Sequence, residues 1–267
     1  MIENIKSFLI LLLIGYSFLV VYLYFMQDRL IFPGAYSFKD VVQQSGYIEK
    51  ETSEFSLKTK DNIKLSGLIS QKNSDTLLIY FGGNAENCTN FVSLISKFEK
   101  IDSVALNYRG YGKSEGKPSE QKLYTDALEI YDHFKDKYKY IIPVGKSLGT
   151  PIATYVSSKR KLQGTILITP LDSITDVAKT IFPILPIKLL LNHPFNSIEH
   201  LKNINSPISL LMVKNDEVIP NKNTLNLKEN INKLALFTVV ENSGHNTITN
   251  DGKFFKFIFQ SIEKFKL

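Results

Sequence analysis

The sequence of 267 residues has little of what builds disulfide frameworks or metal sites. Cys88 is the only cysteine, so no intrachain disulfide can form, and cysteine usage leaves the redox compartment open. The four histidines are spread along the chain without the spacing of zinc ligands, and there is no C-x-x-C motif. We therefore expect neither a metal nor a cofactor.

The sequence also lacks a dense basic block, internal repeats and low-complexity segments. Its formal net charge is +6, but the lysines are scattered rather than gathered into an arm that binds nucleic acid. They predict a solvated surface, with mild attraction to anionic lipid as the alternative. Hydrophobic residues make up 43% and charged residues 22%, which is typical of a globular protein with one large core.

Residues 8–26 carry no charge, and thirteen of them are Leu, Ile, Val or Phe. As a helix this run has about the length that crosses a hydrocarbon core of ~30 Å. A cleaved signal peptide is the main alternative, but its apolar part is shorter and ends in a small-x-small site, which is absent here. We expect a single-pass membrane anchor. Too few charges flank it to apply the positive-inside rule, so its orientation stays open.

Beyond a linker with Pro33 and Gly34, residues 53–70 alternate between polar and apolar and predict two strands joined by a turn at 60–62. Short, nearly continuous apolar runs follow, of the kind found in parallel strands that are buried on both faces. They are residues 76–81, 103–108, 140–145, 165–170, 208–213 and 235–240.

Helical patterns lie between these runs, at 119–137, 148–159 and 254–265. The alternation predicts an α/β domain over residues 35–267, after an anchor and linker over 1–34. Residues 171–200 are apolar and rich in proline, and we interpret them as a helical cap inserted between two strands. An ordinary crossover helix with a loop is the alternative.

The segment 144–149, VGKSLG, fits two motifs. A phosphate-binding loop requires glycine five residues before Gly145, where the chain has Tyr140. The same letters contain G-x-S-x-G, the nucleophile elbow, in which Ser147 sits on a sharp turn between a strand and a helix. Gly145 and Gly149 lie where side chains would collide with that turn. We assign no chemistry to Lys146.

A serine nucleophile needs a base, and the base needs an acid to orient it. Asp216 follows the strand 208–213, and His245 follows the strand 235–240. Both therefore lie at the carboxyl edge of the predicted sheet, in the order Ser, Asp, His. We predict a triad of Ser147, Asp216 and His245, with Asp172 as an alternative acid.

The oxyanion formed on attack requires two backbone donors. The N–H of Leu148, directly after the nucleophile, is the first candidate. The second is the N–H of Asn84, in the glycine-rich loop 82–87 that follows the strand 76–81. An ordinary glycine-rich turn is the alternative for this loop.

The chain resembles the membrane-anchored α/β-hydrolases that include the yeast Bem46-like proteins and the mammalian ABHD13 and ABHD17 groups. The likeness rests on FGGNAEN (81–87), NYRGYGKSEGKPSE (107–120), VGKSLG, the stretch 182–220 and SGHN (243–246). The chain departs from the family where Gly82 replaces histidine, Glu86 replaces glycine, and Met212-Val213 replace His-Gly. The cysteine-rich N-terminus of the depalmitoylases among these relatives is also absent.

The resemblance implies the α/β-hydrolase fold: a mostly parallel sheet with antiparallel N-terminal strands, helices on both faces, a small helical cap and one preceding transmembrane helix. It also implies hydrolysis of carboxylic esters or thioesters near a membrane. We expect a small or lipid-like acyl substrate, or an acylated protein, and no nucleic acid. A serine peptidase or amidase on the same fold and a catalytically silent membrane scaffold are the alternatives.

Overall fold

The apolar runs form one sheet in the computed structural model, which describes residues 1–36 and 51–265. The strands in this part of the chain are β1 (Ser53–Lys58), β2 (Lys64–Ser70), β3 (Thr76–Phe81), β4 (Asp102–Leu106), β5 (Tyr140–Lys146), β6 (Thr165–Ile168), β7 (Ile208–Val213) and β8 (Leu234–Val240). Their order is β1-β2-β4-β3-β5-β6-β7-β8. β2 runs antiparallel to both of its neighbours, β1 and β4, and the strands from β3 to β8 are parallel to one another. The sheet is therefore mostly parallel with antiparallel pairing at its N-terminal strands, as predicted.

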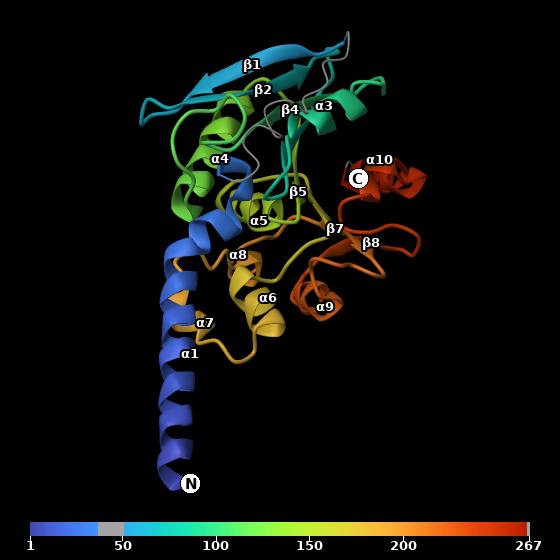
Figure 1. The fold of residues 1–267 in the computed structure, drawn as a ribbon. Helices are drawn as coiled ribbons and strands as arrows, with labels where there is room; N and C mark the ends of the chain where they lie inside the picture. Colours follow the sequence, from blue (N-terminus) through green and yellow to red (C-terminus); the bar gives the residue numbers. More distant parts are fainter. Residues whose placement is uncertain (37–50, 266–267) are drawn as a thin grey trace.

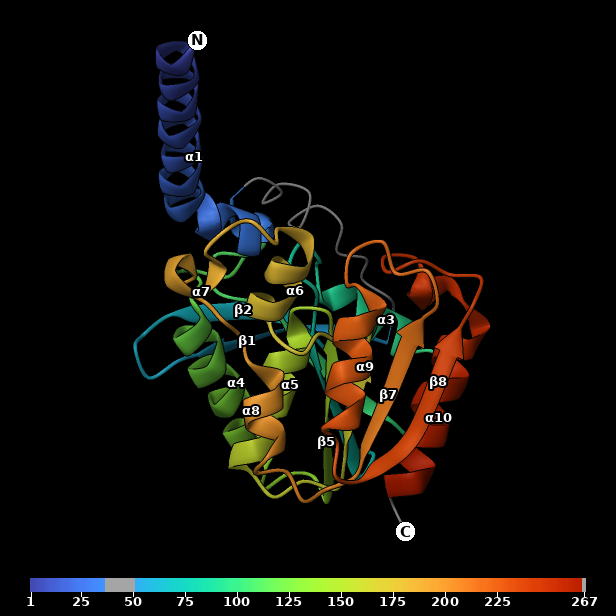
Figure 2. The same ribbon diagram turned by 90° about the horizontal axis from the view of Figure 1, so that it is seen from below.

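Helices cover both faces of the sheet (Figures 1 and 2). The helices in the described residues are α1 (Ile2–Ile31), η1 (Pro33–Ala35), α3 (Thr89–Ile95), α4 (Glu120–Phe134), α5 (Gly149–Lys159), α6 (Ile174–Ile181), α7 (Ile187–Leu190), α8 (Ser197–Leu201), α9 (Asn221–Glu229), η2 (Ile248–Asn250) and α10 (Gly252–Phe265). The α/β-hydrolase architecture inferred from the sequence is therefore confirmed.

Two cores hold the layers together, and β3 contributes to both because its side chains alternate between the two faces. Leu77 and Ile79 join the core that contains residues of α4 and α5. Leu78 and Tyr80 join the core that contains residues of α3 and α10. Burial on both faces explains why β3 reads as a continuous apolar run instead of an alternating one.

The predicted cap segment, 171–200, contains α6, α7 and the first part of α8. Figure 2 shows α6 and α7 beside the end of α1, at the same end of the sheet as the loops that follow β7 and β8. No residue of α6 is fully buried, so this helix packs loosely on the body of the fold. The division into an anchor at 1–34, a domain at 35–267 and an inserted cap stays a prediction.

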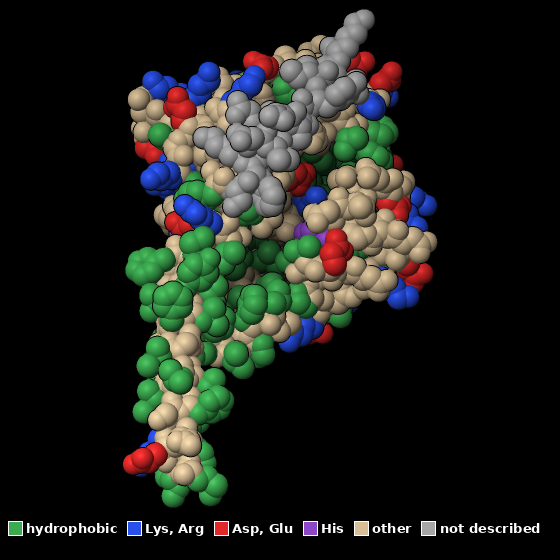
Figure 3. All heavy atoms as spheres, in the orientation of Figure 1, with side chains coloured by type: hydrophobic (Ala, Val, Ile, Leu, Met, Phe, Trp, Pro, Cys, Tyr) green, Lys and Arg blue, Asp and Glu red, His purple; other side chains and the backbone are tan. Residues whose placement is uncertain are grey.

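α1 is a helix of 30 residues that is long and apolar enough to cross a membrane. None of its most apolar 18-residue window is buried against the rest of the protein. Figure 3 shows its apolar side chains (green) standing free along its length. Only the carboxyl end of α1 enters the fold, where Gln27 and Ile31 are buried.

Candidate active site

Ser147 lies on the turn between β5 and α5, and its φ of 51° is in the left-handed region. A non-glycine residue in that region costs about 1–3 kcal/mol unless its surroundings hold it there. The Ser147 N–H donates to Ile168 O at 3.1 Å. A Cβ at Gly145 would collide with the backbone of Gly149, and one at Gly149 with the carbonyl of Phe81. Close backbone packing therefore fixes the strained turn.

Asp216 lies in the loop between β7 and α9, and its side chain is only 2% exposed. Its Oδ1 accepts the N–H groups of Val218 at 2.9 Å and Ile219 at 2.7 Å. These bonds turn the carboxylate back toward the loop that follows β8. Asp216 is therefore held in place before it meets the imidazole.

His245 follows β8, and its side chain is also 2% exposed. Its Nδ1 lies 2.9 Å from Asp216 Oδ2 and 3.0 Å from Oδ1. The backbone N–H of His245 donates to Glu217 Oε2 at 2.9 Å, and this bond holds the pKa of the Glu217 carboxyl below its usual range. Because Nδ1 is engaged by Asp216, Nε2 is the ring atom left for proton transfer.

Ser147 and His245 line one cleft of about 290 Å³, together with Asn84, Glu86 and Lys146. Asp216 reaches the cleft through its contact with His245. No hydrogen bond joins Ser147 to His245 among the described residues. Such contacts are often long in unliganded enzymes and tighten when substrate binds. The structure thus brings the three predicted residues to one site, and their catalytic roles stay predictions.

Of the two predicted oxyanion donors, Asn84 lines this cleft and Leu148 directly follows Ser147. Within the described part of the chain, the N–H groups of Leu148 and Asn84 have no hydrogen-bond acceptor. The carbonyl of Asn84 accepts the Gly34 N–H at 3.1 Å and the Tyr111 hydroxyl at 2.7 Å. The peptide group between Asn84 and Ala85 is therefore held by the linker that follows α1 and by Tyr111.

Sequence reasoning missed a polar network beside the nucleophile. Glu86 Oε2 lies 3.2 Å from Lys146 Nζ and accepts the Gly83 N–H at 2.9 Å. Its Oε1 accepts the Tyr80 hydroxyl at 2.8 Å, and burial, followed by the charge of Glu86, raises the pKa of that hydroxyl. The Lys146 side chain is only 8% exposed. The one signal in the sequence was that Glu86 stands where the resembling family has glycine.

The structure separates Asp172, the alternative acid, from His245. The carboxylate of Asp172 is buried and accepts the amides of Asn223 at 3.0 Å and Asn226 at 2.8 Å, both from α9. It also accepts the N–H of Ser173 at 2.7 Å. Among the described residues it makes no bond to His245. Asp172 therefore ties the start of the cap segment to α9.

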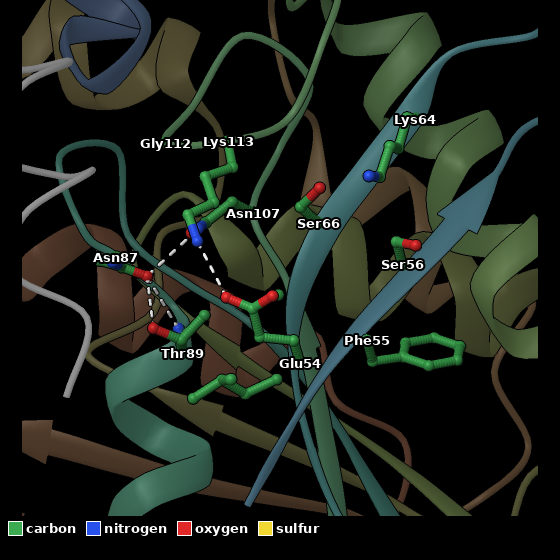
Figure 4. Close-up of a pocket in the computed structure, with 12 residues that line it drawn as sticks. Glu54, Phe55, Ser56, Lys64, Ser66, Asn87, Thr89, Asn107, Gly112 and Lys113 are labelled. Atoms are coloured by element: carbon green, nitrogen blue, oxygen red, sulfur yellow. Dashed lines mark hydrogen bonds and ion pairs between the residues drawn. The ribbon is translucent and has the colours of Figure 1, made fainter. Parts of the chain in front are cut away.

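A second hollow, of about 380 Å³, opens beside β1 and β2 (Figure 4). Asn87 borders both this hollow and the cleft at Ser147. Its Oδ1 accepts Thr89 Oγ1 at 2.7 Å and Asn107 Nδ2 at 3.2 Å. The hollow contains none of the predicted catalytic residues. In the described residues, no group of three or more His, Cys, Asp or Glu side chains is arranged to hold a metal ion.

Solved structures with similar coordinates define the class of the fold. An α/β-hydrolase from Vibrio vulnificus matches with a TM-score of 0.68 and 21% identity, over 88% of this chain and 93% of that one. An esterase from Pyrococcus furiosus matches with a TM-score of 0.60 and 20% identity, over 79% and 91%. The chain is therefore an α/β-hydrolase by fold.

Sequence relatives define the family, although no protein-family model matches the chain. The uncharacterised membrane protein YNL320W of Saccharomyces cerevisiae is 33% identical over 87% of this chain and 88% of its own. The bem46 protein of Schizosaccharomyces pombe is 27% identical, over 74% and 73%. The human α/β-hydrolase domain-containing protein 17C is 31% identical, over 64% and 53%. The chain belongs to the Bem46-like α/β-hydrolase family, as its motifs indicated.

Proposed function

We propose that the protein is a membrane-anchored serine hydrolase that cleaves carboxylic-ester or thioester acyl groups. One observation carries the proposal. A serine held at positive φ between β5 and α5 shares a cleft with a histidine whose Nδ1 is bound by a buried aspartate. These are the parts that activate a hydroxyl for acyl transfer.

In the proposed reaction, Ser147 Oγ attacks the carbonyl carbon of the substrate while His245 Nε2 takes its proton. Asp216 holds the imidazole and stabilises the imidazolium that forms. The carbonyl oxygen becomes an oxyanion that accepts the N–H groups of Leu148 and Asn84. Donors held by the backbone in this way would stabilise the charge with little reorganisation as it develops.

The tetrahedral intermediate then collapses. The bond to the leaving oxygen or sulfur breaks, and His245 gives its proton to that atom, which leaves as an alcohol or thiol. The acyl group stays on Ser147 as an ester. Water then attacks this ester, with His245 accepting its proton, and the carboxylic acid leaves while Ser147 regains its hydrogen.

The membrane part of the proposal rests on α1, whose most apolar 18-residue window is not buried against the rest of the described chain. A run of 19 uncharged residues, 8–26, favours insertion of such a helix into a bilayer. A yeast relative that covers nearly the whole chain is named a membrane protein, which supports the same reading. A lipophilic acyl group is the substrate we expect beside the apolar cap.

The experiment compares acyl esters, thioesters and aminoacyl amides of increasing chain length with the full-length protein in vesicles. We expect esters or thioesters to be cleaved fastest and longer chains to be preferred. Ser147→Ala should abolish turnover, and Ser158→Ala, in the helix α5 that follows the nucleophile, should retain it. Faster cleavage of the amides would indicate a peptidase. If Ser147→Ala turned over substrate as fast as the unaltered protein, the proposed mechanism would be wrong.

A further inference from the structure

Apolar side chains at the tip of the cap segment are exposed rather than packed against the protein. Ile184 is 76% exposed and Leu189 is 86% exposed, and Ile181 and Phe182 beside them are about half exposed. Single exposed apolar side chains are ordinary, but four within nine residues form a patch of the kind that marks a binding surface. The patch includes α6, the turn at 182–186 and α7.

This patch runs alongside α1. Gln27 Nε2 donates to Leu190 O at 3.2 Å, and Gln27 Oε1 accepts the Asn192 N–H at 2.7 Å. Further along α1, the Tyr16 hydroxyl donates to Ile184 O at 2.8 Å. Tyr16 and Gln27 are 11 positions apart, which corresponds to about 16 Å of helix at a rise of 1.5 Å per residue. The cap therefore follows α1 well into its uncharged run, 8–26.

An apolar groove joins the two elements. It has a volume of about 160 Å³ and is lined by side chains of α1, α6, α7 and the turn between them, including Leu23, Leu30, Ala178, Phe182 and Leu185. Figure 3 shows apolar side chains continuing from α1 onto the neighbouring part of the fold. We call α1 together with residues 174–191 the anchor–cap surface.

The position of Tyr16 within the uncharged run 8–26 indicates what covers this surface. If residues 8–26 lie in hydrocarbon, Ile184 lies beside their middle. A turn at that depth requires partners for its backbone carbonyls, because lipid supplies none. The bond from Tyr16 supplies such a partner for Ile184.

We infer that the tip of the cap inserts into the membrane beside α1, and that lipid acyl chains cover the anchor–cap surface. This inference rests on the anchoring part of the proposed function. The loops that carry Asp216 and His245 lie at the same end of the sheet as the cap (Figure 2). Insertion would therefore hold the cleft at the membrane surface, where acyl chains are concentrated.

The chain contains no tryptophan, so one introduced tryptophan reports on one position alone. Ile184→Trp and Leu189→Trp test the cap, and Phe18→Trp tests α1. Leu234→Trp, at the amino end of β8, is the matched control, because Leu234 is a partly exposed leucine at the opposite end of the sheet. The full-length variants are reconstituted in phosphatidylcholine vesicles with or without bromine on the acyl chains, and circular dichroism checks their folding.

We expect brominated chains to quench the emission of the Ile184→Trp and Leu189→Trp variants as they quench that of Phe18→Trp. The Leu234→Trp variant should keep its emission and be quenched by aqueous iodide instead. If only Phe18→Trp is quenched by bromine, the anchor holds and cap insertion is wrong. If Phe18→Trp is not quenched either, the anchor is wrong and cap insertion falls with it. Neither result touches the proposed chemistry at Ser147.

Discussion

Two regions at the carboxyl end of the sheet differ in their chemistry. The cleft at Ser147 is lined by polar and charged groups, among them His245, Glu86 and Lys146. The groove of the anchor–cap surface, at the same end, is lined by apolar and aromatic side chains apart from Gln27. The first region suits the proposed reaction, in which charge develops and polar groups stabilise it. The second region suits binding to a membrane, because an exposed apolar surface favours contact with lipid.

The linker after α1 connects these two regions. The Gly34 N–H donates to the carbonyl oxygen of Asn84. The N–H of the same residue, Asn84, is a proposed oxyanion donor. Gly34 also lies so close to the ring of Tyr111 that a Cβ there would collide with it. We therefore expect the linker after α1 to influence the geometry of the cleft. Substitutions of single residues can test the two regions separately.

The largest effect is expected at the acid of the triad. Asp216→Asn should lower kcat by about 10⁴-fold, because the amide would hold the imidazole in the wrong tautomer. Asp172→Asn is the matched control at a second buried aspartate, and it should alter stability more than kcat. The measurement is steady-state hydrolysis of a soluble ester. A large loss of kcat with Asp172→Asn but not with Asp216→Asn would reverse the assignment.

Gly34→Ala tests whether the linker sets the geometry of the cleft. The new Cβ would push Tyr111 and the Asn84 peptide aside, so kcat should fall by up to about 10²–10³-fold, the cost of losing one oxyanion donor. KM for a soluble ester should change much less. Gly15→Ala, in the middle of α1, has nothing within 4 Å of its Cβ and should leave kcat unchanged. Equal kcat for both variants would uncouple the linker from the site.

Lys146→Met tests the charged network in the cleft. It would leave the Glu86 carboxylate without its cation, which we expect to lower the free energy of unfolding by about 1–3 kcal/mol. The double variant Glu86→Gln and Lys146→Met removes both charges but keeps an amide oxygen as an acceptor, and it should recover part of that loss. Urea titration measures both. If the double variant were less stable than Lys146→Met, the Glu86 carboxylate would not depend on Lys146 as its counter-charge.

The smallest effect concerns His200, in α8 at the base of the cap. Burial lowers its pKa to about 4. The unfolded chain binds a proton near the usual pKa of about 6.5, so this residue reduces stability as the pH falls from 6.5 to 4. His200→Gln should therefore flatten the pH dependence of the unfolding midpoint in that window. An unchanged slope would mean that His200 does not titrate differently in the folded state.

Much of this fold could be predicted from the sequence because burial on both faces leaves continuous apolar runs. β3 and β7 match their predicted bounds, and β5 extends one residue further. Asp216 and His245 could be placed because loops after parallel strands meet at one edge. The contacts of Glu86 with Lys146, Gly34 with Asn84, and Tyr16 with Ile184 join residues 50 to 168 positions apart. No local pattern encodes such pairs, since they depend on how the finished layers pack.

The most direct test of the central claim is the site of attachment of a fluorophosphonate. The full-length protein is treated with the probe and digested with trypsin, which releases residues 147–159 as one peptide because Lys146 precedes it. Tandem mass spectrometry then locates the phosphonyl group. The proposed mechanism predicts that it lies on Ser147 and that His245→Gln prevents labelling. Attachment to another serine, or none in the folded protein, would contradict the assignment of Ser147 as the nucleophile.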